Sequence, residues 1–145
     1  PHVVQPIKVL SDAIFQSTYP LVVYSMGNFI SNQTKPNTDG GIMVELTLGK
    51  DKDTEKAQLL DHHYIPVWRY VRKDSKGRRK YFTVPVSAFE NGNEKRLGMR
   101  SKDRAAMRAF ARKTRKHLAQ WDGVERTIKL ATVFKKKGST SIVKN

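Results

Sequence analysis

The chain divides into two parts by the spacing of its apolar residues. Up to about residue 93, short apolar runs alternate with Gly, Pro, Asn, Asp and Ser, which is typical of β-strands joined by turns. Beyond that point apolar residues recur three and four positions apart, which predicts a helix. Five strands are predicted in the first part, at residues 3–10, 21–26, 41–48, 58–73 and 80–86.

Two of these strands are expected to differ in how they are buried. Residues 21–26 form an apolar run that follows Pro20, and this pattern is typical of a central strand covered on both faces. Residues 41–48 alternate between apolar and polar positions, which predicts one buried and one exposed face. The predicted buried face carries Ile42, Val44, Leu46 and Leu48.

The predicted strand at residues 58–73 separates aromatic from aliphatic side chains. Tyr64, Trp68 and Tyr70 share one face, and Ile65, Val67 and Val71 share the other. The turn residues at 75–77 then predict a hairpin between this strand and residues 80–86. Pro6 removes a backbone donor from the first strand, so that strand is expected at a sheet edge or with a bend.

A long helix is predicted over residues 102–121, with Ser101 as its N-cap and Asp122-Gly123 at its end. Residues 126–134 are compatible with a last strand or a short helix. The buried face of the helix is predicted to carry Met107, Phe110, Ala111, Thr114, Leu118 and Trp121.

The predicted fold class is α+β, a mainly antiparallel sheet followed by a C-terminal amphipathic helix. Three regions are expected along the chain. Residues 1–93 form a β-rich lobe, residues 94–134 form a basic helical extension packed on it, and residues 135–145 form a flexible tail.

The chain has a formal net charge of +15, and most of this charge lies in its second part. Residues 1–93 hold 12 Lys and Arg against 9 Asp and Glu, whereas residues 94–145 hold 16 against 4. Helical spacing groups four arginines on one face of the predicted helix: Arg104, Arg108, Arg112 and Arg115. Such a face is compatible with a polyanion partner, an anionic membrane surface, or a basic surface that favours solubility.

Several kinds of catalytic and metal site are excluded by the residues present. The chain has no cysteine, so it has neither a disulfide framework nor a thiolate metal site. It also lacks a glycine-rich phosphate loop, a His-Glu-x-x-His helix and a serine or cysteine nucleophile motif. The adjacent His62 and His63 should point to opposite faces of a strand, so they are not expected to share one ion. An independent enzyme is therefore not expected.

Three polar residues next to predicted strands are candidates for a site. His2 precedes the first strand, where a neutral imidazole can bind a metal ion or act as a general acid, or it is an ordinary surface or partly buried histidine. Asn28 follows the second strand, after a glycine that permits a sharp change of backbone direction, and it either reaches the rim of a site or belongs to a turn that ends the strand. Asp39 lies in Thr38-Asp39-Gly40-Gly41, which predicts either a plain turn or an anion-binding backbone nest.

Three segments together resemble the C-terminal third of the CapA family of poly-γ-glutamate capsule proteins. Residues 1–6, Pro-His-Val-Val-Gln-Pro, look like the end of that family's Gly-His-x-Pro-His-Val motif. Residues 24–30, Tyr-Ser-Met-Gly-Asn-Phe-Ile, look like its Tyr-Ser-Leu-Gly-Asn-Phe strand, with Met26 in place of leucine. Thr38-Asp39-Gly40-Gly41 follows in the same order and spacing, and the resemblance covers about residues 1–73.

The CapA family is similar to the calcineurin-like metallophosphoesterases, and this implies a fold and a metal site. The chain would be half of a four-layer α/β/β/α sandwich, and the other half would precede it in a longer protein. By resemblance, His2 is the last histidine of the metal motif, and Asn28 and Asp39 lie on the rim of the substrate site. The remaining ligands of the divalent metal ions would lie upstream of Pro1. Metal ions are therefore expected in the full-length parent and none in this fragment alone.

The implied function is that of a C-terminal fragment, catalytically incomplete alone, of a protein that makes or exports an anionic capsule polymer. The resemblance places it on the extracytoplasmic side of the cell envelope. Its expected partners are the missing N-terminal lobe and the polymer, and exposed sheet edges should also permit self-association. The alternative interpretation is a basic module that binds nucleic acid or another polyanion. Tyr64, Trp68 and Tyr70 could then stack on bases, whereas aromatic residues in such a pattern are more often part of the core.

Overall fold

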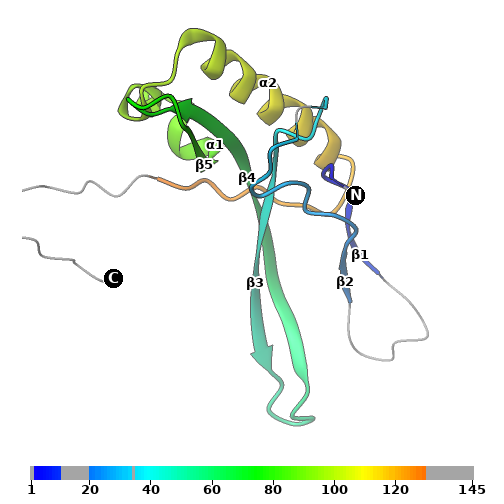
Figure 1. The fold of residues 1–145 in the computed structure, drawn as a ribbon. Coiled ribbons are helices and arrows are strands. Elements are labelled where there is room, and N and C mark those ends of the chain that lie inside the picture. Colours follow the sequence, from blue (N-terminus) through cyan, green and yellow to red (C-terminus); the bar gives the residue numbers. More distant parts are fainter. Residues whose placement is uncertain (1, 11–19, 34, 130–145) are drawn as a thin grey trace, which may run out of the picture.

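The computed structural model of the chain describes residues 2–10, 20–33 and 35–129. The α+β class, with antiparallel sheets followed by a helix, is confirmed (Figure 1). β1 pairs with β2, and β3, β4 and β5 form a second sheet in that order. The elements are β1 (Ile7–Val9), β2 (Leu21–Val23), β3 (Gly40–Lys50), β4 (Ala57–Lys73), β5 (Arg79–Pro85), α1 (Val86–Phe89), the 3₁₀ helix η1 (Asn93–Leu97) and α2 (Ser101–Leu118).

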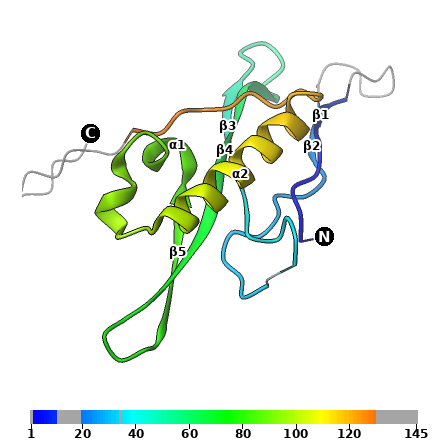
Figure 2. The same cartoon turned by 90° about the horizontal axis from the view of Figure 1, so that it is seen from above.

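Strand β4 organises the larger sheet because it is long enough to pair with two partners along its length. Its first part, up to Trp68, pairs with β3, and its last part, from Val67, pairs with β5. The predicted hairpin between the fourth and fifth strands is thereby confirmed. Figure 2 shows that the β3–β4 and β4–β5 hairpins extend to opposite sides of the helix.

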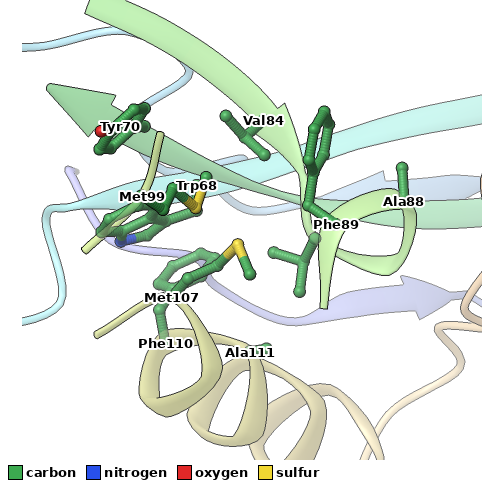
Figure 3. Packing of buried hydrophobic residues seen from close by; sticks show 10 residues of the cluster. Trp68, Tyr70, Val84, Ala88, Phe89, Met99, Met107, Phe110 and Ala111 are labelled. Atoms are coloured by element: carbon green, nitrogen blue, oxygen red, sulfur yellow. The ribbon is translucent and has the colours of Figure 1, made fainter. Parts of the chain in front are cut away.

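The main hydrophobic core lies between this sheet and α2 (Figure 3). Trp68 and Tyr70 of β4 and Val84 of β5 pack with Met107 and Phe110 of α2. A second cluster of buried side chains joins the β1–β2 pair to β3, β4 and the end of α2: Ile7, Ile42, Tyr64 and Leu118. The predicted apolar face of the helix is confirmed by the burial of Met107, Phe110, Ala111, Thr114 and Leu118.

Helix α2 starts and ends differently from the prediction. Its N-cap position is Arg100 rather than Ser101, because the Asp103 carboxylate accepts a hydrogen bond from the backbone N–H of Arg100. It ends at Leu118, so Trp121 lies beyond the helix. The chain leaves the helix here because Asp122 is tied to β1: its N–H donates to Ile7 O at 3.2 Å and its Oδ2 accepts from Val9 N at 2.8 Å.

The prediction of a central strand at residues 21–26 was wrong. β2 covers only Leu21–Val23, pairs with β1 in a two-stranded sheet, and is half-buried throughout. Tyr24 and Met26 are 55% and 53% exposed, because the described residues cover only one face of this segment. β1 is likewise shorter than the predicted residues 3–10, although an isolated bridge between Val4 and Met26 continues the pairing.

The predicted buried face of β3 is buried only at its start. Ile42 is 2% exposed, whereas Leu46 and Leu48 are 48% and 64% exposed. Leu60, which lies across the register shift in the same hairpin, is 63% exposed. The end of the hairpin extends beyond the β1–β2 pair and α2 (Figure 1). None of the three leucines belongs to either cluster of buried side chains among the described residues.

The segment after sheet β3–β4–β5 contains two short helices, α1 and η1, that were not predicted. The expected boundary at residues 93/94 falls at the start of η1. After α2 the chain runs back beside β4, where Tyr64 N donates to Val124 O and Arg126 N donates to Tyr64 O. Residues 130–134 of the predicted last element and the expected tail at 135–145 lie outside the described residues. Among the helices described, none is long and apolar enough to cross a bilayer.

Candidate functional site

His2 and Asn28 lie side by side although they are far apart in the sequence. The Nδ1 atom of His2 is 3.2 Å from the Oδ1 atom of Asn28. His2 is exposed, whereas only 8% of Asn28 is exposed. The antiparallel pairing that continues from β1 and β2 through the Val4–Met26 bridge brings these two residues together.

The amide of Asn28 is held in one orientation, and this determines where the neutral His2 ring carries its proton. Asn28 Nδ2 donates to the carbonyl of Thr38 at 2.9 Å and to Oε1 of Gln33 at 3.2 Å. Because a carbonyl oxygen can only accept, the Oδ1 atom of Asn28 is the one that faces His2. His2 therefore donates from Nδ1, and Nε2 of the neutral ring carries a lone pair. Metal-binding histidines are oriented by a hydrogen bond of this kind.

Two glycines at the start of β3 allow this part of the molecule to pack closely. The N–H of Asn28 donates to Gly40 O at 3.0 Å, and the N–H of Ile42 donates to Met26 O at 2.8 Å. A Cβ atom on Gly41 would lie 2.5 Å from Met26 O, and one on Gly40 would lie 2.5 Å from Val67 O. Neighbouring backbone thus occupies the space that a side chain would need at either position.

Asp39 directly precedes β3 and is tied to β4. Its Oδ2 atom accepts a hydrogen bond from Trp68 Nε1 at 3.0 Å, and its carbonyl accepts from Arg69 N at 2.9 Å. Thr38, its neighbour, is the buried residue whose carbonyl holds Asn28. The structure therefore brings His2, Asn28 and Asp39 onto adjoining segments around the start of β3.

His2 and Asn28 do not make a metal site by themselves. Within residues 2–10, 20–33 and 35–129, no three His, Cys, Asp or Glu side chains lie close enough together to hold one ion. His62 and His63 have other partners: His62 Nε2 is 2.7 Å from the carbonyl of Asp122, and His63 lies 3.4 Å from the carboxylate of Asp61.

Arg115, one of the four arginines predicted to bind a polyanion, has an internal role. Its guanidinium forms hydrogen bonds of 2.7 to 2.9 Å to the carboxylates of Glu125 and Glu90. These bonds, with Glu125 contributing most, raise the pKa of Arg115. The hydrogen bond from Arg115 holds the pKa of Glu90 below its usual range. Arg115 thus fastens α2 to the end of α1 and to the segment that follows α2.

Two more of these arginines also have partners inside the protein. Arg108 pairs with Glu94, which is only 3% exposed, and donates to the carbonyl of Glu90. Arg104 donates to Met99 O at 3.0 Å and to Ser101 Oγ at 3.1 Å. Only Arg112 of the four is exposed with no hydrogen bond or ion pair to another described residue. The four do not form one open anion-binding surface.

The aromatic residues that the alternative interpretation assigned to base stacking are in the core. Tyr64, Trp68 and Tyr70 are 4%, 6% and 3% exposed. Trp68 and Tyr70 stack on each other with ring centroids 6.0 Å apart. None of the three offers an open face to a base.

The tip of the β4–β5 hairpin is a basic surface that the sequence analysis did not single out. Its cross-strand pairs bring like charges face to face, Arg72 opposite Lys80 and Lys73 opposite Arg79. The turn adds Lys76 and Arg78, and Asp74, which pairs with Arg78, is the one acidic residue of the stretch 72–80. The high density of Lys and Arg in this stretch of the sequence could have indicated a basic surface.

A groove also runs along one side of α2. It consists of two adjoining cavities of about 380 Å³ each, which share Asn37, Phe110 and Lys113 in their walls. One cavity extends to Val3 and His117, and the other extends to Lys35, Asp39 and Arg69. This groove was not predicted, because its two walls come from segments far apart in the chain. Only the spacing of Lys113 and His117 on one side of the helix could be read beforehand.

Comparison with known proteins found no match for this chain, whether among family models, curated proteins or solved structures.

Proposed function

We propose that this chain is the C-terminal lobe of a longer CapA-type protein, the parent protein, which makes or exports an anionic poly-γ-glutamate-type polymer at the cell envelope. The observation that carries the proposal is the contact of His2 with Asn28, which in turn is held by Thr38. Each of these residues belongs to a different one of the three motifs on which the resemblance rests. A resemblance in separate short motifs gains support when the motifs meet in space.

The proposed role of His2 is to supply one ligand to a metal site in the parent protein. Its Nδ1–H is held by Asn28, so Nε2 is available to an ion. Divalent metals bound there would polarise a phosphoryl oxygen and activate water. Asn28 acts as a positioning residue, because it is buried and orients the imidazole. The fragment alone is incomplete as an enzyme.

The proposed partner surface for the missing N-terminal lobe is the end of the β3–β4 hairpin. Leu46 and Leu48 alternate on one side of β3 there and are 48% and 64% exposed. Apolar side chains exposed together on one sheet commonly mark a surface that another element covers. In the isolated lobe the same surface would favour self-association.

Replacement of His2 by alanine in the parent protein is expected to lower the polymer recovered from the source cell by about tenfold or more, since a metal ligand is lost. His2 is exposed, so the fold should be unaffected. His63→Ala is the matched control, because His63 lies in the β3–β4 hairpin away from Asn28. The amount of polymer is compared between strains that contain equal amounts of the parent protein. An unchanged amount of polymer from the His2→Ala strain would contradict the proposal.

The alternative function, binding of nucleic acid, is favoured by one observation, the basic tip of the β4–β5 hairpin. Lys and Arg attract the phosphates of nucleic acid whatever its base sequence. Competition between poly-γ-glutamate and duplex DNA across a salt series separates the two functions. The alternative would be favoured if duplex DNA binds more tightly than poly-γ-glutamate and its affinity falls steeply as the salt concentration rises.

A further inference from the structure

We propose that the tip of the β4–β5 hairpin, together with Phe29 and Ile30 beside it, docks on the surface of a bilayer that contains anionic phospholipids. The cations of the tip would pair with lipid phosphates, and the two apolar side chains would enter the headgroup region. The inference goes beyond the proposed function, and neither His2 nor Asn28 takes part in it.

The hairpin tip carries positive charge that the protein itself does not balance. Its stretch 72–80 holds six exposed cations: Arg72, Lys73, Lys76, Arg78, Arg79 and Lys80. Asp74, the one acidic residue there, pairs with Arg78. The side chains of the three lysines form no ion pair or hydrogen bond with any described residue. Like charges opposite each other destabilise a hairpin, so an anionic partner would stabilise this one.

An exposed apolar segment lies along the same hairpin. The hydroxyl of Thr83 donates to Phe29 O at 2.9 Å. Three residues further along the chain, Asn32 Oδ1 accepts from the hydroxyl of Tyr81 at 2.8 Å. The segment therefore runs beside β5 in the direction of the tip. Its side chains of Phe29 and Ile30 are 51% and 58% exposed.

The apolar segment and part of the charge share one face of the hairpin. Alternation along β5 puts Arg79, Tyr81 and Thr83 on the same face. Lys73 is paired in register with Arg79, so it lies on this face as well. Arg79 also donates to Asn32 Oδ1, at 3.4 Å. Membrane binding strengthens with both buried apolar area and attraction to anionic lipids, and this face offers both.

The apolar segment favours a lipid surface over nucleic acid as the partner. The phosphates of either partner would attract the cations of the tip. Base stacking requires aromatic side chains, and the stretch 72–80 contains none. Ile30 likewise has no ring on which a base could stack. It would gain free energy by leaving water for the boundary between headgroups and acyl chains.

The first test measures binding of this chain to vesicles of mixed phosphatidylglycerol and phosphatidylcholine, with phosphatidylcholine vesicles as the uncharged reference. Lys73→Gln combined with Lys76→Gln is expected to weaken binding by about twentyfold, because each cation near an anionic surface strengthens binding by about fivefold. Lys52→Gln combined with Lys56→Gln is the matched control. It removes the same charge at the β3–β4 hairpin, on the other side of the helix (Figure 2), and should change binding by less than about twofold.

A second pair of variants tests the apolar contact. Ile30→Ser is expected to weaken binding to the mixed vesicles by about fivefold, since its side chain would no longer gain from leaving water. Val124→Ser is the matched control, because Val124 is 54% exposed and lies in the segment after α2. It should leave binding unchanged. Thermal unfolding shows that each variant is folded.

The orientation of the bound protein can be measured because the chain has no cysteine. Ser75→Cys and Lys52→Cys each provide one position for an environment-sensitive fluorophore, at the ends of the β4–β5 and β3–β4 hairpins respectively. The emission is expected to shift to shorter wavelength on the mixed vesicles with the label at position 75. It should not shift with the label at position 52.

Four results would overturn the proposal. They are equal losses from the two double lysine variants, unchanged binding by Ile30→Ser, a shift only with the label at position 52, and tighter binding of duplex DNA than of the vesicles through Lys73 and Lys76. The last would assign the tip to nucleic acid. All of these variants keep His2 and Asn28, so a failure here leaves the His2→Ala experiment on polymer production unaffected.

Discussion

Replacement of Gly41 by alanine is expected to lower the free energy of unfolding by about 3 kcal/mol, since an added Cβ would overlap backbone that cannot move aside. That Cβ would lie 2.5 Å from Met26 O and 3.1 Å from backbone atoms of Asn28. The clash would separate β3 from the segment that carries Asn28. Urea unfolding measures the loss of stability.

Gly49→Ala is the matched control in the same strand. The three atoms nearest to a Cβ on Gly49 would all belong to the side chain of Leu60, which is 63% exposed and can rotate away. The free energy of unfolding of this variant should stay within about 0.5 kcal/mol of that of the unsubstituted chain. Equal stability of the Gly41→Ala and Gly49→Ala variants would contradict the described packing of the three motifs.

Replacement of Arg115 by methionine is expected to destabilise the chain by about 2–3 kcal/mol at neutral pH, because two half-buried carboxylates lose their shared cation. The side chains of Glu90 and Glu125 are 19% and 21% exposed, and that of Arg115 is 33% exposed, so the loss is smaller than for a fully buried pair. Arg112→Met serves as the control, since Arg112 is exposed without such partners, and it should have almost no effect.

The loss of stability caused by Arg115→Met is expected to be smaller in acid than at neutral pH. Hydrogen bonds from Arg115 lower the pKa of Glu90 in the folded state relative to its usual value of 4.5. The stabilisation is therefore complete above pH 4.5 and is lost as the pH falls through the lower folded-state pKa. Unfolding curves should show that the difference in free energy of unfolding between the unsubstituted chain and the Arg115→Met variant becomes smaller in acid. A difference that does not change with pH would mean that the ion pairs are not its cause.

Much of the fold could be predicted because its strands and helix have clear periodicities. The β4–β5 hairpin and the buried face of α2 follow from local alternation and helical spacing. The strand predicted at residues 21–26 failed for a tertiary reason. An apolar run indicates that both faces of a segment could be buried. Whether both are buried depends on which elements pack against them in the folded protein. Here Leu21 and Val23 pack against the cluster of Ile42, Tyr64 and Leu118 on one face, and Met26 is exposed.

The candidate site was predictable only in part. His2 and Asn28 stood out as motif residues, but their contact depends on pairing between segments that the periodicity did not place. Helical spacing put four arginines of α2 on one side, yet spacing could not show that Glu90 lies within reach of Arg115 and that Glu94 lies within reach of Arg108. Gly40 and Gly41 suggested a turn, and their requirement for glycine comes instead from the neighbouring backbone.

The most direct measurement is the intact mass and N-terminal sequence of the protein as its source cell makes it. The CapA-type assignment predicts a longer polypeptide in which Gly-His-x stands immediately before Pro1 and aspartate-containing metal motifs lie further upstream. A native polypeptide that starts at Pro1, or one without these motifs, would contradict the CapA-type assignment.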